Sequence, residues 1–231
     1  MENMNTFQQF FYYFDENGSY VFMQFVQHFL ISIYGVLIAA VVGIPTGILI
    51  SKYGRLSTYV ITIANIIQTI PGLAMLAILM LAIGLGQTTV VVAVFLYSLL
   101  PIIKNTYTGI NNINKDLTDS GKGMGMTKLQ VLYMIELPLS LSVIIAGIRI
   151  ALVVAIGITA IGAFIGAGGL GDIIIRGTNA TDGTAIILAG AIPTALMAVL
   201  SDLILSFIER KIDPVKKNRK LVEPKIESLE E

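Results

Sequence analysis

Apolar residues gather in five stretches, each long enough to cross a lipid bilayer. A bilayer core about 30 Å thick needs roughly 20 apolar residues at a helical rise of about 1.5 Å each. The stretches lie near residues 24–50, 58–83, 88–109, 139–165 and 184–208. The pattern therefore predicts an all-α integral membrane protein with about five transmembrane helices.

The chain divides into three parts around these stretches. Residues 1–23 are polar, aromatic and acidic, and we expect them to form an extracytoplasmic segment. The aromatic run at 10–14 is too short for a sixth span, which favours a segment at the membrane interface. Residues 24–210 form the transmembrane domain. Residues 211–231 mix Lys, Glu and Pro, which predicts a solvated charged tail.

Composition narrows the classes of function. Charged residues make up 13% of the chain and the mean hydropathy is +0.81, whereas soluble domains carry about 25% charged residues. The formal net charge is zero, so the chain offers no basic field to a nucleic acid. Cysteine is absent, which excludes disulfides and cysteine-ligated metal sites.

Basic residues set the orientation, because cytoplasmic loops carry an excess of Lys and Arg. With the N-terminus outside, the inner loops and the tail hold all 15 basic residues except Arg149, within a span, and Arg176, in an outer loop. The inner loops before the tail contain Lys52, Arg55, Lys104, Lys115, Lys122 and Lys128. We therefore expect a multi-pass protein with its C-terminus in the cytoplasm.

The loop at 110–138, between the third and fourth spans, carries signals for two short helices. Asn114 suits an N-cap, and Gly125 suits the left-handed position that ends a helix. Thr127 and Gln130 then have the spacing of a capping box. Pro138 should stop or bend the second helix. The loop is thus predicted to hold two helices joined at Gly125, followed by an extended entry into the fourth span.

The same loop resembles a motif of permease subunits in ATP-binding-cassette importers, which has the form E-A-A-x3-G-x9-I-x-L-P. Gly125, Ile135, Leu137 and Pro138 match at the family's spacing. The residues Asp119-Ser120-Gly121 stand where Glu-Ala-Ala is usual, which is a departure from the motif. An ordinary amphipathic loop would not require the Gly-to-Pro spacing.

Other segments look like the branch of these importers that carries glycine betaine, carnitine and choline. The similar segments are Gly43-Ile44-Pro45, Gln68-Thr69-Ile70-Pro71, Gly147-Ile148-Arg149 and the glycine-rich run 166–171. The resemblance covers about residues 27–210. Another small solute, such as an amino acid, remains an alternative substrate.

The resemblance implies a division of labour among several proteins in a bacterial cell membrane. The 110–138 loop would form a coupling helix that docks on a cytoplasmic ATP-binding subunit, present in two copies. That subunit would hold ATP and magnesium, so this chain is expected to carry no cofactor and no catalytic residue. An extracytoplasmic substrate-binding protein and a second permease, identical or related, would complete the complex.

Two glycine patterns invite other interpretations. The run 166–171 satisfies G-x-G-x-x-G, but a dinucleotide site needs a strand before it and a βαβ unit around it. We expect a flexible outer loop that helps to receive the binding protein. The pairs Gly43/Gly47 and Gly162/Gly166 would allow close helix contacts, either internal or with a second subunit.

Polar residues within the spans supply the remaining candidates. Asn65, Gln68 and Thr69 share one helical face, and either line a polar path or bond neighbouring helices. Arg149 and Asp202 lie at similar depths on consecutive spans, which predicts an ion pair; the alternative is that each reaches the headgroups separately.

The remaining signals bear on rival functions. His28, the only histidine, is expected at the outer interface. A stand-alone secondary transporter is the rival function, but five spans leave no even repeat and Asp202 is the only carboxylate well inside a span.

Overall fold

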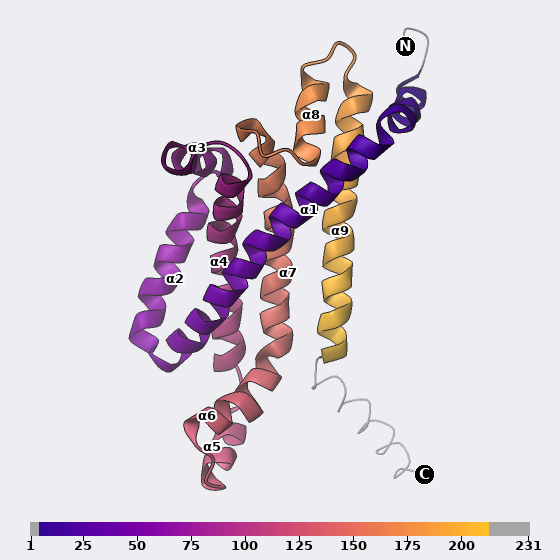
Figure 1. Ribbon diagram of the computed structural model, residues 1–231. Helices are drawn as coiled ribbons and strands as arrows, with labels where there is room; N and C mark the ends of the chain where they lie inside the picture. Colours follow the sequence, from indigo (N-terminus) through magenta and orange to yellow (C-terminus); the bar gives the residue numbers. More distant parts are fainter. Residues whose placement is uncertain (1–4, 213–231) are drawn as a thin grey trace, which may run out of the picture.

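The computed structural model describes residues 5–212, and within them every regular element is a helix (Figure 1). Four helices are long and apolar enough to cross a membrane, and one bent helix pair would supply a fifth crossing. This confirms the prediction of an all-α protein with about five spans. The four long helices are α1 (Thr6–Lys52), α4 (Gln87–Asn111), α7 (Leu137–Gly162) and α9 (Thr184–Ile212). Apart from the last two residues of α9, the predicted tail lies outside the described residues.

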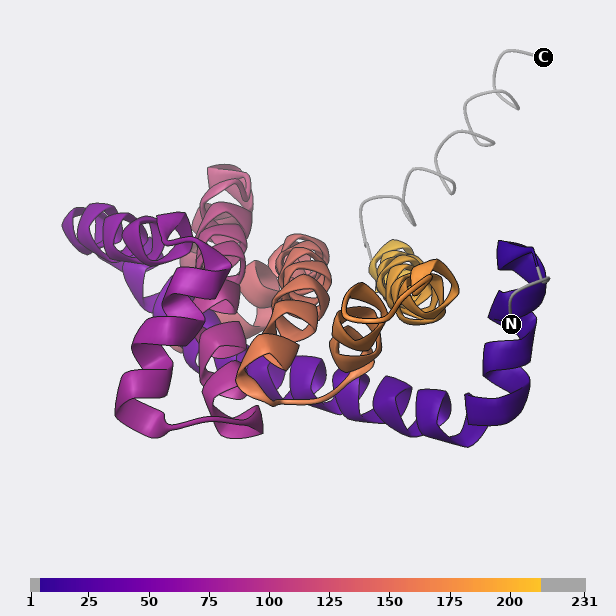
Figure 2. The ribbon, with the colours of Figure 1, turned by 90° about the horizontal axis from the view of Figure 1, so that it is seen from above.

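The first helix, α1, contains 47 residues and so includes residues 6–23 of the expected N-terminal segment. It passes the expected boundary at residue 23 without a break. Figure 2 shows that its first turns swing away from the rest of the helix. The aromatic run at 10–14 thus belongs to the first turns of α1, and its place at the membrane interface stays a prediction. Phe10, Tyr13 and Phe14 pack against the edge of the apolar core.

Helix α1 crosses the row formed by α4, α7 and α9 and packs along α4 (Figures 1 and 2). Small residues permit this close contact: a Cβ at Gly43 would lie 2.9 Å from Ile102 Cγ2, and one at Gly47 would lie 2.6 Å from Thr106 Cβ. A Cβ at Gly162 of α7 would likewise meet α4. Gly43, Gly47 and Gly162 therefore serve contacts within the chain, whereas a Cβ at Gly166 would meet nothing within 4 Å.

The second predicted span, 58–83, is not one straight helix. It consists of α2 (Gly54–Thr69) and α3 (Gly72–Ile83), which meet at an angle of 97°. Pro71 has no N–H to continue α2. The carbonyl of Ile70, freed at the break, accepts a hydrogen bond from the Tyr97 hydroxyl of α4. The bend thus has both a local cause and a tertiary partner.

Two short helices, α5 (Lys115–Gly123) and α6 (Lys128–Val131), follow α4 as expected. The expected extended entry into the fourth span is wrong. A π-helical turn, η1 (Leu132–Glu136), leads directly into α7, and Pro138 lies in the first turn of that helix. The Leu137 N–H donates to the Leu132 carbonyl, five residues back, and Pro138, which has no N–H, follows this π-helical bond.

The segment between α7 and α9 forms the end of the bundle that lies opposite α5 and α6 (Figure 1). A single 3-10 turn, η2 (Ala163–Ile165), precedes the glycine-rich run, and α8 (Leu170–Thr178) packs on α9. In Figure 1, α8 and the first turns of α1 lie at one end, while α5, α6 and the last turns of α9 lie at the other. We call these the α8 end and the α5 end.

Candidate functional site

The α5 end holds a compact unit made of α5, α6 and η1, which we call the α5–η1 unit. Helix α5 closes with two hydrogen bonds: the N–H of Gly125 donates to the Lys122 carbonyl at 2.9 Å, and the N–H of Met126 donates to the Gly121 carbonyl at 3.1 Å. This pair of bonds is the Schellman arrangement. It needs a left-handed residue, and Gly125 has φ = +85°.

Caps fix where both short helices begin. The Asn114 side chain accepts a hydrogen bond from the Asp116 N–H at 2.9 Å. Thr127 and Gln130 form the reciprocal capping box, with the Gln130 N–H donating to the Thr127 hydroxyl and the Thr127 N–H donating to the Gln130 side chain. The local residues thus dictate the turn between α5 and α6.

Motif positions far apart in sequence meet in this unit. A Cβ at Gly121 would lie 2.7 Å from Ile135 Cδ1, so the Ile135 side chain occupies the space above the glycine. This contact joins α5 to η1. Leu137 and Pro138 follow at the start of α7. The motif residues therefore determine how α5 and η1 pack together at the start of α7.

Asp119 and Ser120 have a different position, on the exposed side of α5. The Lys122 ammonium lies 2.8 Å from an Asp119 oxygen, and this hydrogen bond lowers the pKa of the carboxyl below its usual value. Asp119 is therefore ionised at neutral pH. Both residues are available to another protein.

Sequence reasoning missed the apolar surface of the α5–η1 unit. Leu117, Met124, Tyr133 and Met134 are exposed, Met124 by 77%. They lie on α5, at its end and on η1, in a unit that also carries the charged residues Lys115, Asp119 and Lys122. Exposed apolar side chains in such a unit indicate a protein partner. In the sequence, these four residues were visible as apolar positions of the 110–138 loop that lie outside every predicted span.

An ion pair attaches the end of α1 to the same unit. Lys52 Nζ lies 2.5 Å from Glu136 Oε2, and the Glu136 residue is only 8% exposed. A buried carboxylate needs a charged partner. Lys52 therefore joins α1 to η1.

The polar face of α2 lies just before its break. Asn65 and Thr69 are exposed and Gln68 is half-buried. The Thr69 hydroxyl donates to the Ile66 carbonyl at 2.7 Å, within its own helix. None of the three bonds a neighbouring helix among the described residues, so helix-to-helix bonding has no support from the geometry.

Arg149 and Asp202 are brought together as the sequence predicts. Arg149 Nε lies 3.1 Å from Asp202 Oδ1. A third residue, Glu209, lies with Oε2 2.8 Å from Arg149 Nη1. Asp202 and Glu209 share a face of α9, two turns apart, so one guanidinium joins α7 to α9 through two carboxylates.

At the α8 end, three side chains of α1 hold the glycine-rich run. The N–H of Gly169 donates to the Gln24 side chain at 2.6 Å, and the Gln27 amide donates to the Ala167 carbonyl at 3.0 Å. The N–H of Leu170 donates to His28 Nδ1 at 3.2 Å. The run is thus anchored to α1, contrary to the expected flexible loop.

His28 is fully buried, so its predicted place at the interface is wrong. Its Nε2 lies 3.0 Å from the Ile156 carbonyl, while Nδ1 accepts from the Leu170 N–H. This pair of contacts requires the neutral tautomer with the proton on Nε2. The ring therefore links α1, α7 and α8.

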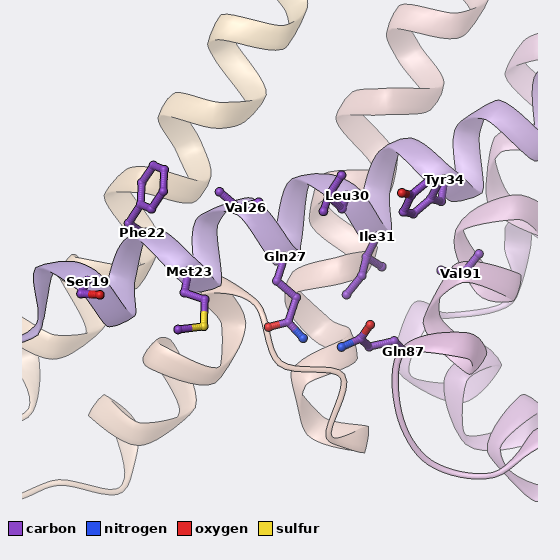
Figure 3. Close-up of a pocket in the computed structure, with 10 residues that line it drawn as sticks. All are labelled: Ser19, Phe22, Met23, Val26, Gln27, Leu30, Ile31, Tyr34, Gln87 and Val91. Carbon is purple, nitrogen blue, oxygen red and sulfur yellow. The ribbon is translucent and has the colours of Figure 1, made fainter.

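Gln27 also lines a groove of about 500 Å³ between α1 and the start of α4. Figure 3 shows the Gln27 and Gln87 amides pointing toward one another across it. Its aromatic residues, Phe22 and Tyr34, lie about 18 Å apart along α1. The two rings are too far apart to enclose one quaternary ammonium group. Among the described residues there is also no group of three or more His, Asp or Glu that could hold a metal ion.

Comparison with known families decides what this architecture is. Residues 35–214 match the family described as "Binding-protein-dependent transport system inner membrane component". The chain belongs to this family. This inner membrane component is a multi-pass transport subunit of the ATP-binding-cassette importer type, as the loop motif indicates.

The relatives of this chain are named as permeases of osmoprotectant transport systems. The chain is 65% identical, over 94% of both chains, to the glycine betaine/carnitine/choline transport system permease protein OpuCD of Bacillus subtilis (strain 168). It is also 65% identical to the choline permease OpuBD of that organism, over 94% of this chain and 96% of the relative. The carnitine permease OpuCD of Listeria monocytogenes (strain 10403S) is 64% identical, over 94% and 97%.

Solved structures share the fold of this component. A chain of the MetNI methionine transporter, in an inward-facing conformation, aligns with a TM-score of 0.76 at 19% identity, covering 83% of this chain and 95% of that one. An amino acid transporter chain aligns with a TM-score of 0.64 at 18% identity, over 86% and 98%.

Proposed function

We propose that this permease subunit imports quaternary ammonium osmoprotectants: glycine betaine, carnitine and choline. The observation that carries the proposal is 65% identity, over 94% of both chains, to a permease named for those three solutes. A relative of similar identity is named for choline alone and another for carnitine. The substrates of this chain are therefore expected within the same set.

A separate ATPase, in two copies, drives transport and holds ATP and magnesium. It docks on the α5–η1 unit, where Leu117, Met124, Tyr133 and Met134 present an apolar surface beside the ionised Asp119. The two glycines of the motif support this role, because Gly125 sets the turn and Gly121 receives Ile135. The unit continues into α7, so motion of the ATPase would be passed directly to a spanning helix.

The α5 end faces the cytoplasm and the α8 end faces outward. Basic side chains support this orientation, because Lys52, Lys115, Lys122 and Lys128 all lie on or beside the α5–η1 unit. The N-terminus is then outside and the C-terminus inside. A substrate-binding protein docks at the outer end, near the anchored glycine-rich run.

The second permease is a related chain rather than a copy. In Bacillus subtilis, two proteins, OpuCD and OpuCB, share the name of one glycine betaine/carnitine/choline system, and this chain is 65% identical to the first and 39% to the second. Between the two permeases, the exposed polar face of α2 lines the path. Asn65 and Gln68 would offer amide groups to a solute beside the broken helix.

The test is uptake by a reconstituted complex of this chain with its ATPase, binding protein and second permease. Radiolabelled glycine betaine, carnitine, choline and methionine are supplied separately to proteoliposomes containing ATP. We expect at least one quaternary ammonium solute to accumulate and methionine not to accumulate. Uptake of methionine alone would refute the substrate class and leave the family unaffected. Uptake driven by an ion gradient without ATPase would favour a stand-alone transporter.

A further inference from the structure

A second groove, at the α5 end, has no part in the function described so far. It has a volume of about 550 Å³ and lies between the end of α1 and the α5–η1 unit. Ile48 and Leu49 of α1 line it on one side, and Leu129 and Leu132 line it on the other. The groove therefore begins on a spanning helix and ends on the short helices.

The charges around this groove favour an anion. Three lysines line it, Lys52, Lys122 and Lys128, with a single carboxylate, Glu136. Lys52 pairs with Glu136, and Lys122 pairs with Asp119. Lys128 makes no ion pair with any of residues 5–212. One cation at the mouth of the groove is thus left without a counter-charge.

An exposed apolar stripe runs along α1 to the same place. Tyr34, Ile38, Val41 and Leu49 are exposed, and their spacing of three or four residues, or multiples of it, puts them on one face. Lys52 continues that face one turn beyond Leu49. Gly43 and Gly47, which contact α4, occupy the opposite face. Along this stripe, an apolar side chain lies next to a lysine only at the groove, where Lys52 follows Leu49.

We propose that this groove binds an anionic phospholipid, with the phosphate beside Lys128 and an acyl chain along the stripe of α1. A phosphate requires cations, and an acyl chain requires apolar surface at membrane depth. The groove supplies both, because Leu49 belongs to a spanning helix and Lys52 ends it. The lipid would bridge α1 and α6, so it would steady the unit that receives the ATPase.

A single introduced tryptophan can test this, because the chain has none. The full-length Leu49→Trp variant is placed in phosphatidylcholine nanodiscs that contain a small fraction of brominated phosphatidylglycerol. Leu49 is 51% exposed, so the larger ring has room. The matched control is Leu203→Trp on α9, where the leucine is 58% exposed. We expect brominated phosphatidylglycerol to quench the first fluorophore more strongly than an equal fraction of brominated phosphatidylcholine, and the control equally with both.

Charge variants in the Leu49→Trp background identify the headgroup contact. Lys128→Gln should weaken the preference for phosphatidylglycerol about fivefold, the effect expected for one lysine near an anionic headgroup. Lys128→Arg should retain the preference, and Lys211→Gln, which removes a charge at the end of α9, should leave it unchanged. Equal quenching by both lipids, or an equal preference at Leu203→Trp, would overturn the proposal.

A further arm adds the ATPase subunit and subtracts the fluorescence of the same complex without the introduced tryptophan. Persistence of the lipid-specific quenching supports a lipid site. Its loss on ATPase binding would assign the groove to the ATPase and overturn the lipid assignment.

Discussion

Replacing Gly125 tests whether the left-handed turn between α5 and α6 couples ATP to transport. The position has φ = +85° and no atom within 4 Å of an added Cβ, so a substitution there acts through the backbone alone. A left-handed conformation costs about 1–2 kcal/mol for an ordinary residue and more for a β-branched one. The two hydrogen bonds that close the turn contribute together about 2 kcal/mol. The strain is therefore comparable to the stabilisation it opposes.

These magnitudes predict a graded series of variants. Gly125→Asn should retain most of the uptake, because Asn tolerates the left-handed region. Gly125→Ala should lower ATP-driven uptake severalfold, and Gly125→Val should abolish it. Gly123→Val is the matched control, because Gly123 also has open space but no positive φ. It should transport normally.

Uptake is measured in proteoliposomes that hold the complete complex, with permease amounts matched by quantitative immunoblot. Full uptake by Gly125→Val would refute the reasoning. Equal losses in Gly123→Val and Gly125→Val would mean that a side chain at this surface, rather than backbone strain, is what blocks transport.

Two further predictions concern contacts within the chain. Arg149→Gln should lower the yield of folded protein more than Asp202→Asn does, because the first leaves two unpaired carboxylates and the second leaves Arg149 paired with Glu209. An unpaired charge costs up to about 3 kcal/mol at a helix centre. The double variant, Arg149→Gln with Asp202→Asn, should therefore recover part of the lost yield, which is measured by fluorescence-detected gel filtration. Strictly additive losses would contradict the pairing. Gly121→Ala should be tolerated because the flexible end of Ile135 can move, whereas Gly121→Leu should impair ATP-driven uptake. Adding Ile135→Ala to Gly121→Leu should restore uptake, and no recovery would exclude the proposed contact.

Local signals in the sequence predicted local structure well. Asn114, Gly125 and Thr127 act through hydrogen bonds within a few residues, so their roles as caps and turn were readable before any tertiary structure was known. The apolar runs of α4 and α9 were equally clear, because a span needs only length and composition. The family motif located the unit that joins these local elements.

Tertiary partners decided the features that the sequence left open. Pro45, Pro101 and Pro193 lie inside continuous helices, whereas Pro71 stands at a sharp bend. All four lack an N–H, but only Pro71 directly follows the end of a helix, and there the Ile70 carbonyl accepts a hydrogen bond from the Tyr97 hydroxyl of α4. No sequence pattern near Pro71 announces that partner.

The positions of buried polar residues also depend on tertiary partners. The place of His28 depends on the Ile156 carbonyl and the Leu170 N–H, both more than 100 residues away along the chain. Glu209 could have been found from its spacing to Asp202, which puts both on one face of α9. Only the packing of α9 on α7 reveals that Arg149 reaches them both.

The central claim, that the α5–η1 unit is a cytoplasmic dock for the ATPase, can be tested by thiol labelling because the chain lacks cysteine. Met124→Cys marks the unit, and Thr181→Cys marks the exposed loop between α8 and α9. A membrane-impermeant maleimide is applied to inside-out and right-side-out vesicles, with and without saturating ATPase subunit. We predict that Met124→Cys reacts only in inside-out vesicles and is protected by the ATPase, while Thr181→Cys reacts only in right-side-out vesicles and is unaffected. Labelling of Met124→Cys from the outside, or no protection by the ATPase, would contradict the account.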